Sequence, residues 1–95
     1  MNYLIKPSVV IDYVEDEVLI YDMESGFSGK GNKCAYLVFS LLKQGVDNEE
    51  DIVQRLKEKF NESQHSRIEK SVPNILAWAK ERNIIEKKDS SILSI

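Results

Sequence analysis

The 95-residue sequence has few of the residues that usually carry catalysis or metal binding. It contains one cysteine, Cys34, and one histidine, His65, so it offers neither an internal disulfide nor a zinc ligand set. No apolar run approaches the roughly 20 residues of a membrane span. Residues 1–7 lack the charged and apolar regions of a signal peptide. We therefore expect a cytoplasmic domain that needs no metal or other cofactor and has no membrane partner.

The charged residues are unevenly distributed along an otherwise ordinary composition. The chain is 42% hydrophobic and 31% charged, which is typical of a folded domain, and its net charge of −3 opposes binding to nucleic acid. Residues 1–24 carry six acids and one base, whereas residues 63–88 carry six bases and three acids. The basic segment is either a solvated helix face or a surface for an acidic partner.

Alternating patterns in the first third of the chain predict antiparallel strands. Residues 9–14 (VVIDYV) and 17–22 (EVLIYD) are rich in β-branched and aromatic residues, and the polar pair at 15–16 separates them. This arrangement predicts a β-hairpin. Residues 24–26 (ESG) predict a turn in which the glycine takes a positive φ angle. Residues 27–31 begin a third strand that two glycines weaken.

Helical spacing begins at Asn32, a residue suited to capping the N-terminus of a helix. The first helix is predicted to end at Lys43, and Gly45 suits its stop. Asp47 or Asn48 is predicted to cap a second helix, whose first turn is acidic. The side chains predicted to face inward from these two helices are Ala35, Val38, Phe39, Leu42, Ile52, Val53, Leu56 and Phe60.

A third helix is predicted over roughly residues 66–82, after a polar connection at residues 61–65. Pro73 lies inside it and either bends the helix or marks its regular start, with Ser71 as the cap. Strands followed by helices define an α+β domain, predicted to span residues 1–88, with a tail at residues 89–95. The inward side chains of this part are predicted to be Ile68, Val72, Ile75, Leu76, Ala79, Ile84 and Ile85.

A search for chemistry finds no convincing catalytic set. His65 is predicted to be a surface residue, and Cys34 a half-buried apolar residue in the first turn of a helix. Residues 26–31 have the glycine spacing of a phosphate loop, but the lysine and hydroxyl residue that should follow are missing. Trp78, the only tryptophan, falls beside the inward stripe of the third helix. It is either peripheral core or an anchor on a binding groove.

The order and spacing of these landmarks resemble the PqqD-like family, the peptide-recognition element of ribosomal peptide biosynthesis. The resemblance covers roughly residues 8–86, and it departs from the family where SGKG at 28–31 replaces an aromatic-rich third strand and where Asn83 replaces a glycine. The segments that carry it are DEVLIYD at 16–22, ESGF at 24–27, the helix capped by Asn32, EDI at 50–52 and NII at 83–85.

The resemblance implies a winged helix-turn-helix-like fold, with an N-terminal antiparallel hairpin or three-stranded wing followed by three helices. It also implies a non-catalytic protein that binds the leader of a precursor peptide and presents it to a modifying enzyme or leader protease. The leader is expected to add as a strand to the third strand and to pack against the third helix. The residues expected to bind it are Phe27, Ser28, Gly29, Lys30, Asn74, Trp78 and Arg82.

Two other functions are compatible with parts of the sequence. A winged-helix DNA-binding regulator has a similar order of elements, but the acidic residues of the predicted hairpin oppose that function. An enzyme is disfavoured because the sequence contains no catalytic constellation. Within the family, the sequence leaves open whether the product is pyrroloquinoline quinone, a lasso peptide or a radical-modified peptide.

Overall fold

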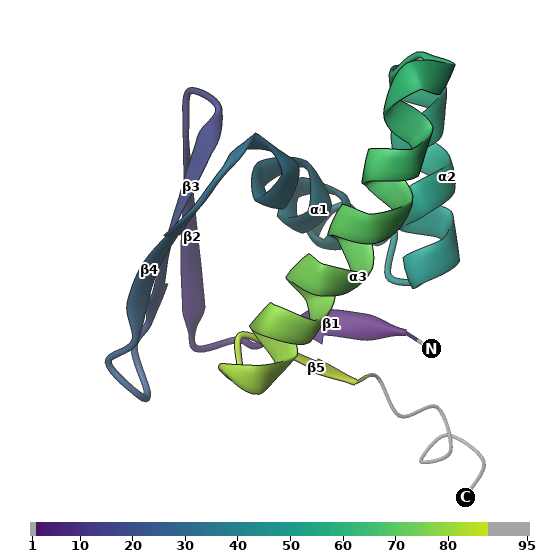
Figure 1. Cartoon of the computed structure of the whole chain (residues 1–95). Coiled ribbons are helices and arrows are strands. Elements are labelled where there is room, and N and C mark those ends of the chain that lie inside the picture. Colours follow the sequence, from purple (N-terminus) through teal and green to yellow (C-terminus); the bar gives the residue numbers. More distant parts are fainter. Residues whose placement is uncertain (1, 88–95) are drawn as a thin grey trace, which may run out of the picture.

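Strands form at both ends of the chain and three helices lie between them (Figure 1). The computed structural model describes residues 2–87, so the predicted tail at 89–95 lies outside the described residues. The predicted α+β class is confirmed. In chain order the elements are β1 (Tyr3–Ile5), β2 (Val9–Val14), β3 (Glu17–Asp22), β4 (Ser28–Gly31), α1 (Lys33–Lys43), α2 (Glu49–Lys59), the short 3-10 helix η1 (Glu62–Gln64), α3 (His65–Glu81) and β5 (Ile85–Lys87).

The predicted wing is present as an antiparallel sheet in the order β2-β3-β4. The β2–β3 hairpin turns through Glu15 and Asp16, and Glu15 takes a φ of 56°. Val18 and Ile20 point from β3 toward the helices and are fully buried, while the alternate residues of β3 face away. The glycines predicted to weaken the third strand do not prevent it, because residues 28–31 pair with β3 over four positions.

A second sheet, which the sequence pattern did not predict, joins the two ends of the described chain. Strands β1 and β5 pair antiparallel from Tyr3 opposite Lys87 to Ile5 opposite Ile85. Each strand has only three residues, too few to show a period. Asn83 turns the chain into β5 with a φ of 58°, which is the left-handed conformation. Asparagine tolerates this conformation, as expected for the residue that replaces the glycine of the PqqD-like pattern.

The helices carry most of the core and begin largely where predicted. Asn32 caps α1 by accepting from the Ala35 amide, and Asn48, not Asp47, caps α2. Helix α3 begins at His65 and contains Pro73 in its interior, so Pro73 does not mark its start and Ser71 is not its cap. The buried apolar residues are Val18, Ile20, Ala35, Val38, Phe39, Leu41, Leu42, Ile52, Leu56, Ile68, Val72, Leu76, Ala79, Ile84 and Ile85.

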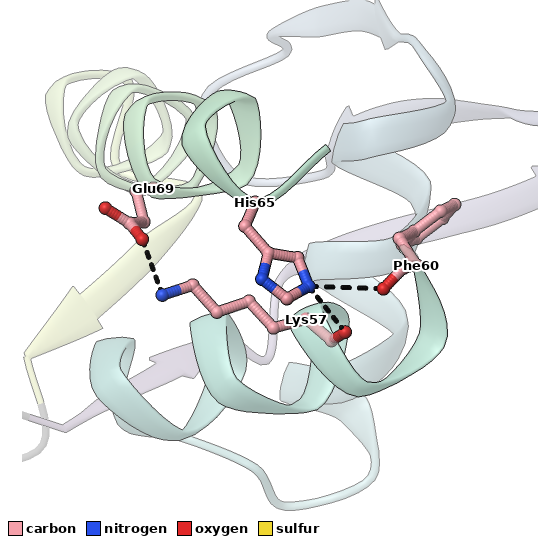
Figure 2. Close-up of polar contacts among 4 residues, drawn as sticks. All are labelled: Lys57, Phe60, His65 and Glu69. Carbon is pink, nitrogen blue, oxygen red and sulfur yellow. Dashed lines mark hydrogen bonds and ion pairs between the residues drawn. The ribbon is translucent and has the colours of Figure 1, made fainter. Parts of the chain in front are cut away.

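His65 is not the free surface residue that the sequence predicted. Its ring is half-buried, and Nε2 lies 3.0 Å from the carbonyl oxygen of Lys57 and 3.2 Å from that of Phe60 (Figure 2). Lys57 lies in the last turn of α2 and Phe60 is its C-cap, so these carbonyls stand where the supply of helical amides ends. Beside the ring, the Lys57 ammonium pairs with Glu69 of α3. His65 therefore joins the end of α2 to the start of α3, which is a structural role.

Asp22 fixes the turn that leads from β3 into β4. Its carboxylate is fully buried and accepts hydrogen bonds from the Ser8 hydroxyl (2.7 Å), the Ser25 hydroxyl (2.9 Å) and the Glu24 amide (3.0 Å). The Ser8 bond contributes most to lowering the pKa of Asp22, which falls from 3.8 to about 2. Sequence reasoning counted Asp22 only among the acidic residues, because a buried carboxylate has no local signature.

We expect Asp22→Asn to lower stability at neutral pH and to remove part of the acid sensitivity of the fold. Because the folded-state pKa of Asp22 is lowered, its contribution is fully present above pH 3.8 and is lost as the pH falls through about 2. Urea denaturation of both proteins at pH 7, 4, 3 and 2 measures this. The difference in unfolding free energy should shrink between pH 4 and 2, and a constant difference across that range would contradict the assignment.

Candidate functional site

The outer edge of β4 offers unpaired backbone groups. Strand β4 is the last strand of its sheet, and the Asp22 amide donates to the Phe27 carbonyl across the β3–β4 pair. Backbone groups of successive strand residues point to opposite sides, so those of Ser28 and Lys30 point away from β3 toward the open edge. An extended peptide placed beside β4 meets these two residues first.

Beside this edge lies a hollow between β4 and the C-terminal half of α3. Its volume is about 250 Å³. By the alternation of β4, side chains at positions 29 and 31 would face this side of the sheet, but both residues are glycine. The residues that line the hollow are Lys30, Gly31, Asn32, Ala35, Asn74, Ile75 and Trp78.

An aromatic and cationic cluster is centred on Trp78, which lines the hollow. The Phe27 ring meets the Trp78 ring edge-on, with centroids 6.1 Å apart, and the guanidinium of Arg82 lies 4.8 Å from the Trp78 centroid. Trp78 is half-buried on the flank of α3, as its position beside the inward stripe predicted. The Trp78 ring contacts both Phe27 and Arg82, and it also lines the hollow. The cluster therefore presents an apolar surface next to a cation.

The seven residues predicted to bind peptide do not all face the hollow. Phe27, Trp78 and Arg82 form the cluster, and Asn74 lies exposed one turn before Trp78. By alternation, the side chains of Ser28 and Lys30 point to the opposite face of the sheet. The Lys30 ammonium lies 3.6 Å from the Glu17 carboxylate in an exposed pair, which makes it a weaker candidate for a peptide contact than its backbone.

Sequence reasoning missed the part that Gly31, Asn32 and Ala35 play in shaping the hollow. A Cβ atom on Gly31 would lie 2.7 Å from Cβ of Ala35 and 2.8 Å from Cγ2 of Val18. The strand therefore passes directly against the start of α1 and the core. The glycine spacing was a visible signal, but the sequence does not say what packs against the missing side chains.

Gly31→Ala and Gly29→Ala are expected to have different effects. The methyl group that Gly31→Ala adds meets the rigid core, so this substitution should cost about 1–3 kcal/mol of stability. A methyl on Gly29 would lie 2.8 Å from the outer end of the Phe27 ring, which can rotate away. Gly29→Ala should therefore stay near parental stability but change the fluorescence of Trp78. Urea denaturation measures the stability of both variants, and emission spectra report on Trp78. Equal losses of stability in the two variants would contradict this account of the hollow.

The remaining reactive side chain lies away from the hollow. Burial raises the pKa of the Cys34 thiol, and a Ser71 hydrogen bond only partly opposes this, so the thiol is not activated. Within residues 2–87, histidine, cysteine and acidic side chains form no group of three or more that could hold a metal ion. In the same range, no helix combines the length and apolar character needed to cross a bilayer.

These features define a winged helix-turn-helix-like α+β domain with an open strand edge facing its third helix. No family model matches the sequence, and no curated protein matches it either. Two solved structures share the fold. One, TbiB1 in complex with the TbiA(beta) leader peptide, has a TM-score of 0.77 and 20% identity, over 92% of this chain and 99% of that one.

The second structure is lasso peptide synthetase B1 complexed with its leader peptide. It has a TM-score of 0.74 and 17% identity, over 92% of this chain and all of the other. The two chains are similar to this one along nearly their whole length, so the fold expected from the sequence resemblance is confirmed.

Proposed function

We propose that this chain is a non-catalytic protein that binds the leader of a ribosomally made precursor peptide and presents it to a modifying enzyme or leader protease. The observation that carries the proposal is the open edge of β4 beside the hollow against α3. Strand addition supplies main-chain hydrogen bonds along such an edge, and a flanking pocket selects alternate side chains. Both similar structures are complexes with a leader peptide, which supports the same assignment.

The composition of the site supports a peptide with an apolar side chain and an acidic one. Trp78 and Ile75 offer the apolar contact in the hollow, and Arg82 offers a cation beside it. Acidic residues Glu15, Asp16 and Glu17 surround the tip of the β2–β3 hairpin, where a DNA-binding wing requires positive charge. This charge favours a peptide over DNA as the partner.

The absence of activated groups among the described residues supports a binding role over catalysis. The pKa of Cys34 is raised, and His65 contacts two main-chain carbonyls at the end of α2. Such a chain acts by positioning its ligand for a separate enzyme, so it needs no cofactor of its own. The chain's single cysteine supports a cytoplasmic location, where peptides of this kind are made.

Calorimetric titration with a panel of leaders, taken from the precursor peptides of the genome that encodes this chain, tests the proposal. We expect one peptide to bind per chain, a scrambled leader of the same composition to bind much more weakly, and duplex DNA to show no salt-dependent binding. Binding of the scrambled leader with the same affinity, or retention on DNA that weakens with salt, would contradict the proposed function.

A further inference from the structure

The β2-β3-β4 sheet has a second edge, formed by β2, which no other strand of the described residues covers. The Val9 amide donates to the Lys6 carbonyl on the side away from β3. By the alternation of an antiparallel strand, the main-chain groups of Ile11 and Tyr13 point to the same open side. Strand β2 therefore offers two successive donor and acceptor pairs to an added strand.

A hollow of about 390 Å³ lies along this edge. Val9, Ile11 and Tyr13 line it from β2, and Leu42 and Lys43 line it from the end of α1. The three β2 residues are only half-buried, and the Lys43 ammonium lies 5.6 Å from the centroid of the Tyr13 ring. Every second side chain of an added strand would face this hollow, so the edge offers an apolar contact as well as hydrogen bonds.

Strand β2 lacks the features that usually keep an edge strand from pairing. These features are a proline, a bulge or a charge that points inward. The sequence VVIDYV contains no proline, and its register with β3 is continuous from Val9 to Val14. The side chains that face the helices are uncharged, because Asp12 lies on the other face. The edge is therefore suited to pairing with another strand.

Charges of opposite sign lie at the two ends of β2. Lys6 precedes the strand and lines the hollow, whereas Glu15 and Asp16 follow the strand at the hairpin. When two copies of β2 pair antiparallel about a two-fold axis, each end of one strand meets the opposite end of the other. The acidic hairpin of each copy then lies beside Lys6 of the other, so the attractive contact is made twice.

We infer that the β2 edge is a self-association surface, and that its partner is the β2 edge of a second copy of this chain. The two three-stranded sheets then form one continuous sheet with a β4 strand at each end. A two-fold axis perpendicular to the sheet keeps the helices of both copies on one side and leaves the outer face, which points away from the helices, free (Figure 1). Each copy keeps its own open β4 edge, so self-association and leader binding are independent.

Sedimentation velocity at concentrations up to the millimolar range measures self-association, and amide hydrogen exchange by NMR locates it. We expect an equilibrium between monomer and dimer, with the Ile11 and Tyr13 amides at least tenfold more protected in the concentrated sample. Val10 and Asp12, whose amides face β3, should be protected in dilute and concentrated samples alike. A chain that stays monomeric, or a dimer that leaves Ile11 and Tyr13 unprotected, overturns the inference.

An exchange of charges tests the two-fold arrangement. Lys6→Glu and Asp16→Lys each place like charges together twice, so each variant alone should dimerise at least fivefold more weakly than the parent. An equimolar mixture of the two variants restores both attractive contacts and should associate as the parent does. Lys6 makes the smallest contribution to the low pKa of Asp22, so Lys6→Glu should fold, which circular dichroism checks.

Lys70→Glu and Glu58→Lys are the matched controls, because they make the same changes of charge at exposed helix positions away from β2. Both should dimerise within twofold of the parent. A mixture of Lys6→Glu and Asp16→Lys that associates no better than either variant alone, or controls that lose as much, would show that the two-fold arrangement is wrong. Protection of Ile11 and Tyr13 by leader in a dilute sample would assign the β2 edge to the leader and overturn the second copy as its partner.

Discussion

Replacing Trp78 with alanine is expected to weaken leader binding by about 2 kcal/mol, or about 30-fold in Kd. The ring lines the hollow beside β4 and holds Phe27 and Arg82 in the same cluster. Its loss removes the apolar anchor and releases both neighbours. Calorimetric titration with the cognate leader measures the effect, with circular dichroism to confirm that the variant is folded.

Two further variants separate the ring from its neighbour. Trp78→Phe keeps an aromatic contact with Phe27 and should recover part of the affinity. Arg82→Glu leaves the ring in place but reverses the adjacent charge, so its smaller loss of affinity should fade at high salt. If folded Trp78→Ala and Arg82→Glu both bind as tightly as the parent, the peptide lies elsewhere.

Lys30→Pro is expected to reduce leader affinity about tenfold or more while leaving the domain folded. The amide of Lys30 points to the open edge, so proline removes a donor to the added strand without removing a bond to β3. One main-chain hydrogen bond contributes about 1 kcal/mol, and the proline ring also crowds the incoming strand. Calorimetry with the same leader measures the change.

Lys30→Ala is the control for this substitution, because it removes the side chain and keeps the amide. The Lys30 ammonium is exposed and pairs with Glu17, so its loss should change leader affinity little. Equal losses for Lys30→Ala and Lys30→Pro would assign the effect to charge and contradict strand addition at this residue.

The elements with a clear period or a cap were predictable from the sequence. The β2–β3 hairpin follows from two alternating runs around Glu15-Asp16, and α1 follows from Asn32 and its apolar spacing. Strands β1 and β5 were not predictable, because three residues carry no period and their partners lie 80 to 84 positions apart. Helix α3 begins at His65, close to the predicted start near residue 66, and the alternative start at Ser71 is wrong because Pro73 lies in the helix interior.

The candidate site was predictable in part. The position of Trp78 beside the inward stripe of α3 placed it on a flank, and helical spacing placed Asn74 and Arg82 near it. The sequence did not show that Phe27 would meet Trp78, or that the Lys30 side chain would turn to the outer face. Both depend on the register of β4, which is set by the turn that buried Asp22 holds.

Amide hydrogen exchange of Ser28 and Lys30, measured by NMR with and without the cognate leader, tests strand addition most directly. These amides point to the open edge of β4, so they should exchange rapidly in the free chain and become strongly protected when the leader binds. Gly29, whose amide faces β3, provides the internal reference and should change less. Leader binding that leaves Ser28 and Lys30 unprotected, with new protection confined to other parts of the chain, would contradict the account.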